Sequence, residues 1–269
     1  MKFRDLDWNQ LWQEARQGKS WRGRKKNDWE KRAPSFAKRN KQSIYADRFL
    51  ALIQPNPSWS VLDFGAGPGT IAIPLAKIVR EVTAADFSNA MLDILNQEAA
   101  AADVNNIRTI HASWEDNWQQ LGIKPHDLVI ASRSLSVDDL QAALTRLNSW
   151  ATKRVVISDR VGTGPFDPDI FAALGRQLEP GPDYIYTVNL LYQMGIYAQV
   201  DFIDLGQRRI YTNRDEAIDS CTWMLGKLTS NEEKKLACYV DDRLELLPNG
   251  KVALSRHTPI RWAMISWNK

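Results

Sequence analysis

The sequence predicts an α/β protein built on a doubly wound sheet with helices on both faces. Between residues 43 and 160, short apolar runs alternate with longer stretches at helical spacing. Such alternation indicates βαβ units and therefore a mostly parallel sheet. The chain has 269 residues, of which 44% are hydrophobic and eleven are Trp. That composition excludes a disordered chain and suits one large domain with an attached arm.

The expected elements follow in order. A helix is expected over 43–53, because Pro55 and Pro57 stop it. Periodicity then predicts helices over 71–78, 90–102 and 137–150, between strands at 60–64, 81–86, 107–112, 127–131 and 154–158.

Beyond residue 160 the alternation loosens. A helix is expected to end within 189–195 and a strand to cover 198–204. Asn213 is the expected N-cap of a helix that continues through Met224 and Leu225, with Glu216 three residues after the cap. Residues 248–250 are expected to form a turn between an amphipathic helix and a strand pair, 251–255 and 260–265.

Residues 1–45 form a basic arm with thirteen Lys and Arg against five Asp and Glu, whereas the remainder holds twenty-two against twenty-seven. The arm could bind nucleic acid through its cations and rings, or pack its rings on the body as a lid. Trp8, Leu11 and Trp12 keep the spacing of one helix face, which favours packing. The other aromatic residues of interest are Trp21, Trp29 and Phe36.

Several protein classes are disfavoured. No run of about 18 apolar residues exists for a membrane-spanning helix, and residues 1–8 do not resemble a secretory signal. Cys221 and Cys238 are too few for a disulfide scaffold and lack metal-ligand spacing. These observations predict a soluble, cytoplasmic protein without a bound metal.

The informative segment runs from Val61 to Thr70 and reads VLDFGAGPGT, a strand followed by a glycine-rich turn and a helix. Glycines there let the backbone approach a ligand closely. The dinucleotide-binding pattern would need a third glycine where Thr70 stands. Asp86 closes the next strand, where a carboxylate can accept both hydroxyls of a ribose. Alternatively, Asp86 could only cap the helix that begins near Ser88.

The G-x-G-x-G spacing with Asp63 before it resembles motif I of the class I S-adenosylmethionine-dependent methyltransferases, and the similarity continues in order over residues 58–160. It implies a Rossmann-like methyltransferase domain over 46–269 with a mostly parallel seven-stranded sheet. An N-terminal helical arm would precede that domain, and an insertion at 205–250 would come before its last strand. The implied cofactor is S-adenosyl-L-methionine. The resemblance implies that it is bound by Asp63, Gly65, Ala66, Gly67, Asp86, Phe87, Met91, Ser113, Trp114 and Ser132.

The sequence departs from the family at two places. Ser113 stands where the family usually carries an Asp that reaches the adenine, so a weaker contact, or one through backbone N–H groups and the Trp114 ring, is implied. After the fourth strand, Ser-Arg-Ser-Leu replaces the Asp/Asn-Pro-Pro-aromatic tetrapeptide of enzymes that modify adenine or the cytosine amino group, and no Cys nucleophile follows a strand. Nucleobase acceptors of these kinds are therefore disfavoured.

Arg133 would suit a carboxylate or phosphate on the acceptor, although a salt bridge with Asp138 would explain it equally. Methyl transfer needs a general base only if the acceptor holds its proton at neutral pH. The three His are poorly placed for that role. By analogy with the family, the expected catalytic residues are Tyr45 and Arg133. The expected substrate-binding residues are Arg133, Tyr192 and Trp223. The alternative is that these side chains only pack.

The sequence thus predicts a methyltransferase that acts on a small-molecule acceptor. One alternative is an RNA methyltransferase or RNA-binding protein that uses the basic arm. The other is a non-catalytic protein that binds S-adenosylmethionine. The acceptor atom and the oligomeric state stay open.

Overall fold

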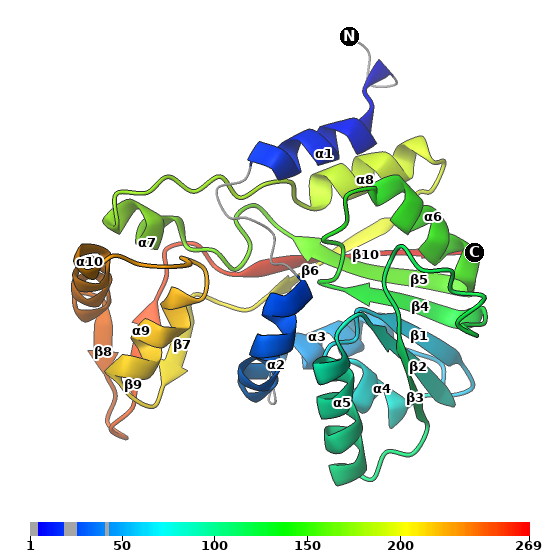
Figure 1. Cartoon of the computed structure of the whole chain (residues 1–269), viewed down its shortest axis with the longest axis horizontal. Helices are drawn as coiled ribbons and strands as arrows, with labels where there is room; N and C mark the ends of the chain where they lie inside the picture. Colours follow the sequence, from blue (N-terminus) through cyan, green and yellow to red (C-terminus); the bar gives the residue numbers. More distant parts are fainter. Residues whose placement is uncertain (1–4, 19–25, 41–42) are drawn as a thin grey trace.

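The computed structural model describes residues 5–18, 26–40 and 43–269 (Figure 1). A seven-stranded sheet runs through the molecule in the order β3-β2-β1-β4-β5-β10-β6. The strands β1 to β5 pair in parallel, and β10 is antiparallel to both β5 and β6. The predicted doubly wound, mostly parallel sheet is confirmed. Its strands are β1 (Ser60–Phe64), β2 (Glu81–Asp86), β3 (Ile107–His111), β4 (His126–Ser132), β5 (Ala151–Arg160), β6 (Gln199–Asp204) and β10 (Arg261–Asn268).

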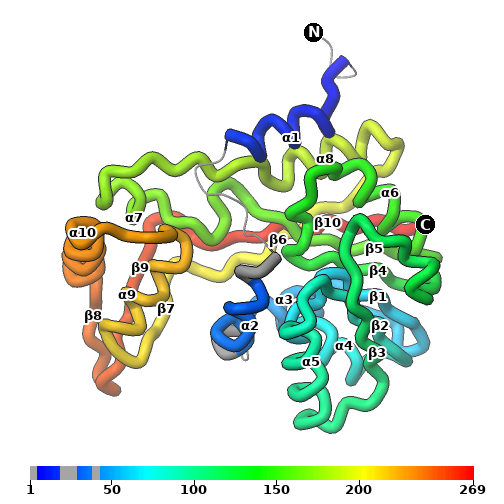
Figure 2. Tube along the Cα trace, viewed as in Figure 1, coloured from blue at the N-terminus to red at the C-terminus, as the bar shows by residue number. Residues whose placement is uncertain are grey.

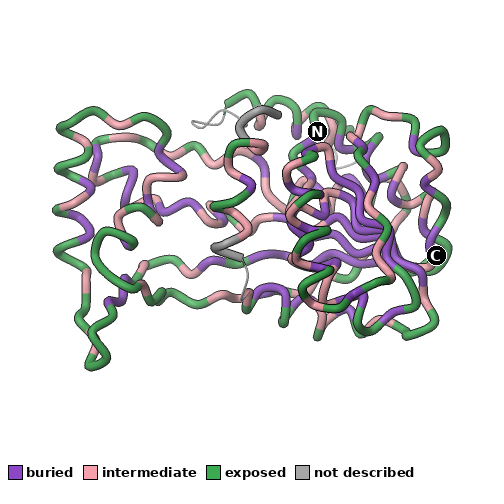
Figure 3. Tube along the Cα trace, turned by 60° about the horizontal axis from the view of Figure 1, so that its bottom comes forward, coloured by how far each residue is buried: buried purple, intermediate pink, exposed green. Residues whose placement is uncertain are grey.

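Helices cover both faces of the sheet, because successive strand residues point to opposite sides and both sides are apolar. Leu62 and Val129 join one core, with α1, α6 and α8, while their neighbours Val61 and Leu128 join the other, with α3, α4 and α5. Figure 3 shows the buried strands at the centre of these layers. The helices are α1 (Trp8–Gly18), α3 (Ile44–Ile53), α4 (Ala72–Ala76), α5 (Asn89–Ala101), α6 (Leu140–Trp150) and α8 (Tyr184–Gln193).

An insertion occupies residues 205–260, between β6 and β10, and forms a separate lobe in Figure 2. It holds a three-stranded antiparallel sheet in the order β7-β9-β8. Together with α7 (Pro168–Ala173) it encloses a third apolar core. Its elements are β7 (Arg208–Tyr211), α9 (Arg214–Thr222), α10 (Ser230–Asp241), β8 (Leu244–Leu246) and β9 (Val252–Ser255).

The insertion differs from the sequence prediction in three respects. The expected strand pair 251–255 and 260–265 is wrong, because β9 lies in the small sheet and β10 in the large one. The turn at 248–250 follows the unpredicted strand β8 rather than a helix. The helix α9 begins at the expected cap, where Asn213 Oδ1 accepts from Glu216 N at 2.9 Å, but it ends at Thr222, before Met224.

The arm packs on the body through α1 and α2 (Lys26–Asn40). Trp12 is buried, and its Nε1 donates to the Val137 carbonyl oxygen at 2.9 Å. Trp8 meets the ring of Tyr186 edge-on, with centroids 5.8 Å apart, and Figure 1 shows α1 alongside α8. The packing predicted for Trp8 and Trp12 is confirmed, while Trp21 lies outside the described residues. The helix α2 lies against α5.

Within the described ranges, no helix has the length and apolarity that crossing a bilayer requires. The same residues contain no cluster of side chains arranged to hold a metal ion, and both cysteines are free thiols.

Candidate active site

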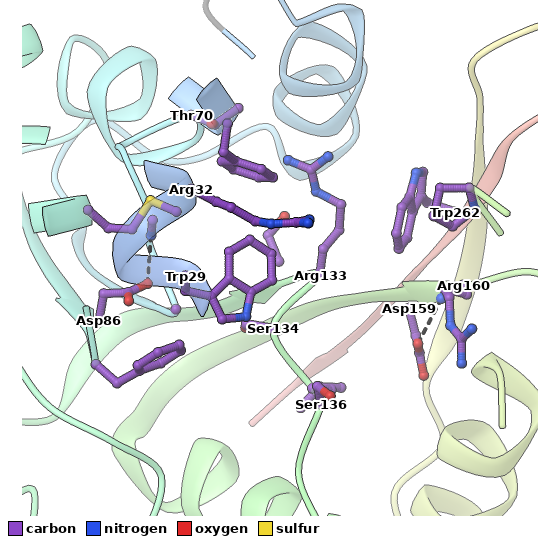
Figure 4. A pocket seen from close by; sticks show the side chains of 18 of the residues that line it. Trp29, Arg32, Thr70, Asp86, Arg133, Ser134, Ser136, Asp159, Arg160 and Trp262 are labelled. Atoms are coloured by element: carbon purple, nitrogen blue, oxygen red, sulfur yellow. Dashed lines mark hydrogen bonds between the residues drawn. The ribbon is translucent and has the colours of Figure 1, made fainter. Parts of the chain in front are cut away.

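A cavity of about 1150 Å³ opens at the carboxyl ends of the parallel strands. Figure 4 shows part of its lining: the turn after β1, the end of β2, α2 and the ends of β4 and β5. The segment after β3 and the insertion contribute the rest. Ligand pockets commonly reach about 1,000 Å³ at most. The cavity can therefore hold two ligands side by side, and strand carboxyl ends are where open α/β sheets bind them.

The glycine-rich turn is shaped by close packing at one glycine and by open space at another. Gly65 has φ +78°, and a Cβ there would lie 2.3 Å from Ser134 Cβ. Gly67 has φ +55°, and a Cβ there would meet nothing within 4 Å. Both conformations suit glycine and strain other residues. At Gly67 the bare backbone therefore faces the cavity, where a ligand can approach it closely.

Asp86 is held rigidly at the end of β2. Its Oδ2 accepts from Gly67 N at 2.8 Å and its Oδ1 from Ser88 N at 2.9 Å. Each carboxylate oxygen has a second lone pair for a ligand hydroxyl. Burial raises the pKa of Asp86, while these two backbone hydrogen bonds oppose the rise. The side chain that caps α5 is Ser88, whose Oγ accepts from Met91 N, so capping that helix does not explain Asp86.

Asp63, on β1, is only 1% exposed, and neither of its carboxylate oxygens has a hydrogen-bond partner among the described residues. Burial, and then the nearby Asp86 carboxylate, raise the pKa of Asp63 to about 7. A buried carboxylate without a partner is costly and is stabilised by a cation. Because Asp63 lines the cavity, a ligand can supply that cation.

The segment after β3 carries the departure from the family pattern. Ser113 lines the cavity, but its N and Oγ both donate to Asp116 Oδ2, at 2.7 and 3.0 Å. The Trp114 ring lies tilted against Phe64, with centroids 4.5 Å apart. Ser113 and Trp114 therefore line the cavity, while Asp116 accepts hydrogen bonds from Ser113 and stabilises the loop.

All ten sequence-predicted cofactor residues line the one cavity. Of the expected catalytic and substrate residues, Arg133 and Trp223 line it as well. Tyr192 is not in this lining: its side chain is 56% exposed and packs on Tyr197. None of the three His is in the lining.

Tyr45 is also absent from the lining. It is buried, and its hydroxyl lies 2.7 Å from Ser132 Oγ and 2.6 Å from Ser158 Oγ. Burial raises the pKa of Tyr45, so the phenol stays protonated. The structure therefore places Tyr45 behind the residues that line the cavity. The guanidinium of Arg133 lies over its ring, with Cζ 4.1 Å from the ring centroid.

Sequence reasoning missed several residues of the cavity. Arg32, on α2, reaches into the space that Arg133 also faces (Figure 4). Asp159 and Arg160 end β5, and Trp262, the second residue of β10, pairs with Arg160. Burial raises the pKa of Asp159 to about 6. Asp159 lies at the carboxyl end of β5, so reasoning from strand ends could have identified it from the sequence.

Comparison with known proteins agrees with this geometry. Residues 61–153 match the family model described as a methyltransferase domain. The chain is 35% identical to an uncharacterized protein of Haemophilus influenzae over 243 residues, which are 89% of this chain and 88% of that protein. It is 39% identical over 116 residues to the ubiquinone/menaquinone biosynthesis C-methyltransferase of Zymomonas mobilis, covering 42% of this chain and 45% of that enzyme.

A solved structure shares the fold at low identity. The cyclopropane-fatty-acyl-phospholipid synthase-like protein of Lactobacillus casei superimposes with a TM-score of 0.53 at 12% identity, covering 83% of this chain and 89% of that one. Matched motifs, sheet order and strand-end cavity thus agree on both fold and cofactor. The chain carries a methyltransferase domain with the fold of the class I S-adenosylmethionine-dependent methyltransferases, and it is a methyltransferase that uses S-adenosylmethionine as its cofactor.

Proposed function

We propose that this methyltransferase acts on a small molecule held in the half of the cavity that the insertion walls. The observation that carries the proposal is the division of the cavity. One half offers the glycine turn and the strand-end carboxylates, and the other offers a wall of rings and apolar side chains. That second wall contains Pro165, Phe166, Phe171, Trp223, Met224, Leu225 and Trp262. Apolar walls with a few charged groups are typical of small-molecule sites.

The cofactor half fits S-adenosylmethionine group by group. Asp86 would accept the ribose hydroxyls, and the unpartnered Asp63 would neutralise the amino group. Arg32, on the helix that covers this half, would bind the carboxylate. Phe87, Met91, Ser113 and Trp114 would line the adenine side. When bound, the cofactor supplies a sulfonium methyl group for in-line displacement.

The chain's own part in the reaction is mainly positioning, which can supply most of the acceleration of such a displacement. Ser132 and Arg133, at the end of β4, would orient the acceptor toward the methyl group. Where the reacting atom of the acceptor carries a proton, Asp159 would accept it, because that carboxylate lines the cavity and has a pKa near 6.

The buried side chain of Trp12 argues against the RNA alternative, since a ring that is packed in the core cannot stack on bases.

The test is a labelling experiment. Methyl-labelled cofactor, at a concentration below its dissociation constant for the wild type, is incubated with the protein and either a low-molecular-mass cell extract or total RNA. The matched control is Asp86→Ala, which is expected to bind the cofactor more weakly. Label should enter the low-mass fraction with the wild type and be strongly reduced with the variant. Label that appears only in RNA would refute the small-molecule proposal.

A further inference from the structure

The Arg133 backbone is held in an unusual conformation where β4 ends. Its φ is +57°, in the left-handed region that residues other than glycine seldom occupy. Its N–H donates to the Ser158 carbonyl oxygen at 3.2 Å and to Ser158 Oγ at 3.0 Å. Strained residues of this kind concentrate at ligand sites, where the surrounding structure fixes them. The geometry thus sets the direction of the Arg133 side chain.

Two aromatic rings hold the guanidinium of Arg133. Its Cζ lies 4.1 Å from the centroid of Tyr45 and 5.7 Å from that of Trp262. The Tyr45 ring is itself fixed, because Ser132 and Ser158 bind its hydroxyl. Rings stack on the faces of a guanidinium and leave the N–H groups on its edge available to a ligand.

No carboxylate of the described residues forms an ion pair with Arg133. Asp138, the partner expected from sequence, instead binds Arg16 at 3.0 Å. Two other arginines of the lining differ: Arg160 donates to the carbonyl oxygens of Pro180 and Pro182, and Arg176 pairs with Glu232 at 2.6 Å. Burial lowers the pKa of Arg133, as expected for a cation without an acidic partner.

We infer that the acceptor is an organic anion, and that its carboxylate or phosphate group binds the edge of Arg133. This inference rests on the proposed function, since it concerns the acceptor half of the same cavity. A half-buried cation that faces a ligand site is stabilised when two oxygens of one anionic group accept two of its N–H groups. The apolar body of the acceptor would then lie against Phe166, Trp223 and Met224.

The test uses benzoate and phenyl phosphate as probes and benzamide as the neutral match, titrated calorimetrically into protein saturated with S-adenosylhomocysteine. At least one anion should bind about tenfold or more tightly than benzamide, and Arg133→Gln should abolish that preference. The anion that binds more tightly shows whether Arg133 prefers a carboxylate or a phosphate group on the acceptor. The matched control is Arg261→Gln, an exposed arginine on the same strand as Trp262, paired with Asp204 at 2.8 Å. It should keep the affinity within about twofold.

Arg133→Lys keeps the charge but loses the planar fork, so it should bind the anion less tightly than wild type and more tightly than Arg133→Gln. Circular dichroism and the affinity for S-adenosylhomocysteine, measured first, show that each variant is folded. Equal binding of benzamide, no binding of either anion, or unchanged anion affinity in Arg133→Gln would overturn the inference. Absence of S-adenosylhomocysteine binding in the wild type would instead overturn the proposed cofactor roles.

Discussion

Replacing Asp63 with Asn should change how the stability of the cofactor-free protein depends on pH. The pKa of Asp63 is about 7 in the folded chain against 3.8 for an ordinary Asp. Between these values the folded protein keeps a proton that the unfolded chain has released, so stability falls as pH rises. The difference of about three pKa units corresponds to roughly 4 kcal/mol of unfolding free energy between about pH 4 and pH 7.

The assay is urea unfolding of the cofactor-free protein at a series of pH values, in wild type and in Asp63→Asn. Asp86 and Asp159 also have raised pKa values and contribute a slope of the same sign in both proteins. The difference between the two proteins therefore reports the titration of Asp63 together with its coupling to Asp86. It should widen in favour of the variant from about pH 4 and stop widening above about pH 7.

Cofactor binding should depend on the same proton in the opposite direction. If the Asp63 carboxylate neutralises the amino group, the affinity for S-adenosylhomocysteine should fall about tenfold for each pH unit below 7, and only in the wild type. Parallel stability curves for the two proteins, or the same pH dependence of binding in both, would refute the account of Asp63 as a buried carboxylate awaiting a cation.

Three further predictions concern other parts of the site. Asp86→Ala should weaken S-adenosylhomocysteine binding by roughly 10- to 150-fold, from the loss of about 1.5–3 kcal/mol. The wild type should not bind NAD. Calorimetry that shows unchanged affinity in the variant, or tight NAD binding in the wild type, would contradict this prediction. Trp223→Ala should impair turnover or acceptor affinity while cofactor affinity stays within about threefold, and a folded variant that loses the cofactor would place Trp223 in the other half. Removal of residues 1–40 should lower the thermal midpoint, because Trp12 leaves the core, and the full chain should show little salt-dependent RNA binding in filter assays. If the logarithm of the RNA affinity instead falls with the logarithm of the salt concentration at a slope near −3, about −0.7 for each of four phosphates, the arm binds nucleic acid.

The sequence was sufficient to predict the sheet and to place the glycine-rich turn, because these signals are local. The segment from Val61 to Thr70 contains the end of a strand and the whole turn within ten residues, and most of its residues line the cavity. By contrast, the predicted pairing of β9 with β10 is wrong. Both runs are apolar and only a short loop separates them, yet each pairs with strands distant in sequence.

The acceptor half was less predictable for a related reason. Whether Tyr45 and Tyr192 face a cavity depends on how their helices are rotated against the body, and tertiary packing decides that rotation. Arg32 was missed because nothing in the basic arm marks one cation among many as the one that enters the cavity. Arg133 was found because a family motif fixed its position after β4, whereas its backbone strain became visible only in three dimensions.

The insertion leaves the sheet and returns to it at one place. Asp204 and Arg261, which flank it, are paired neighbours in the ladder of β6 and β10. A segment whose two ends meet in this way can be exchanged or reshaped without moving any strand that carries the cofactor residues. Under the proposed function, in which the insertion walls the acceptor, acceptor choice and cofactor chemistry can therefore diverge separately. Grafting the corresponding lobe of a relative between these two residues offers a direct way to redirect the enzyme to a different acceptor.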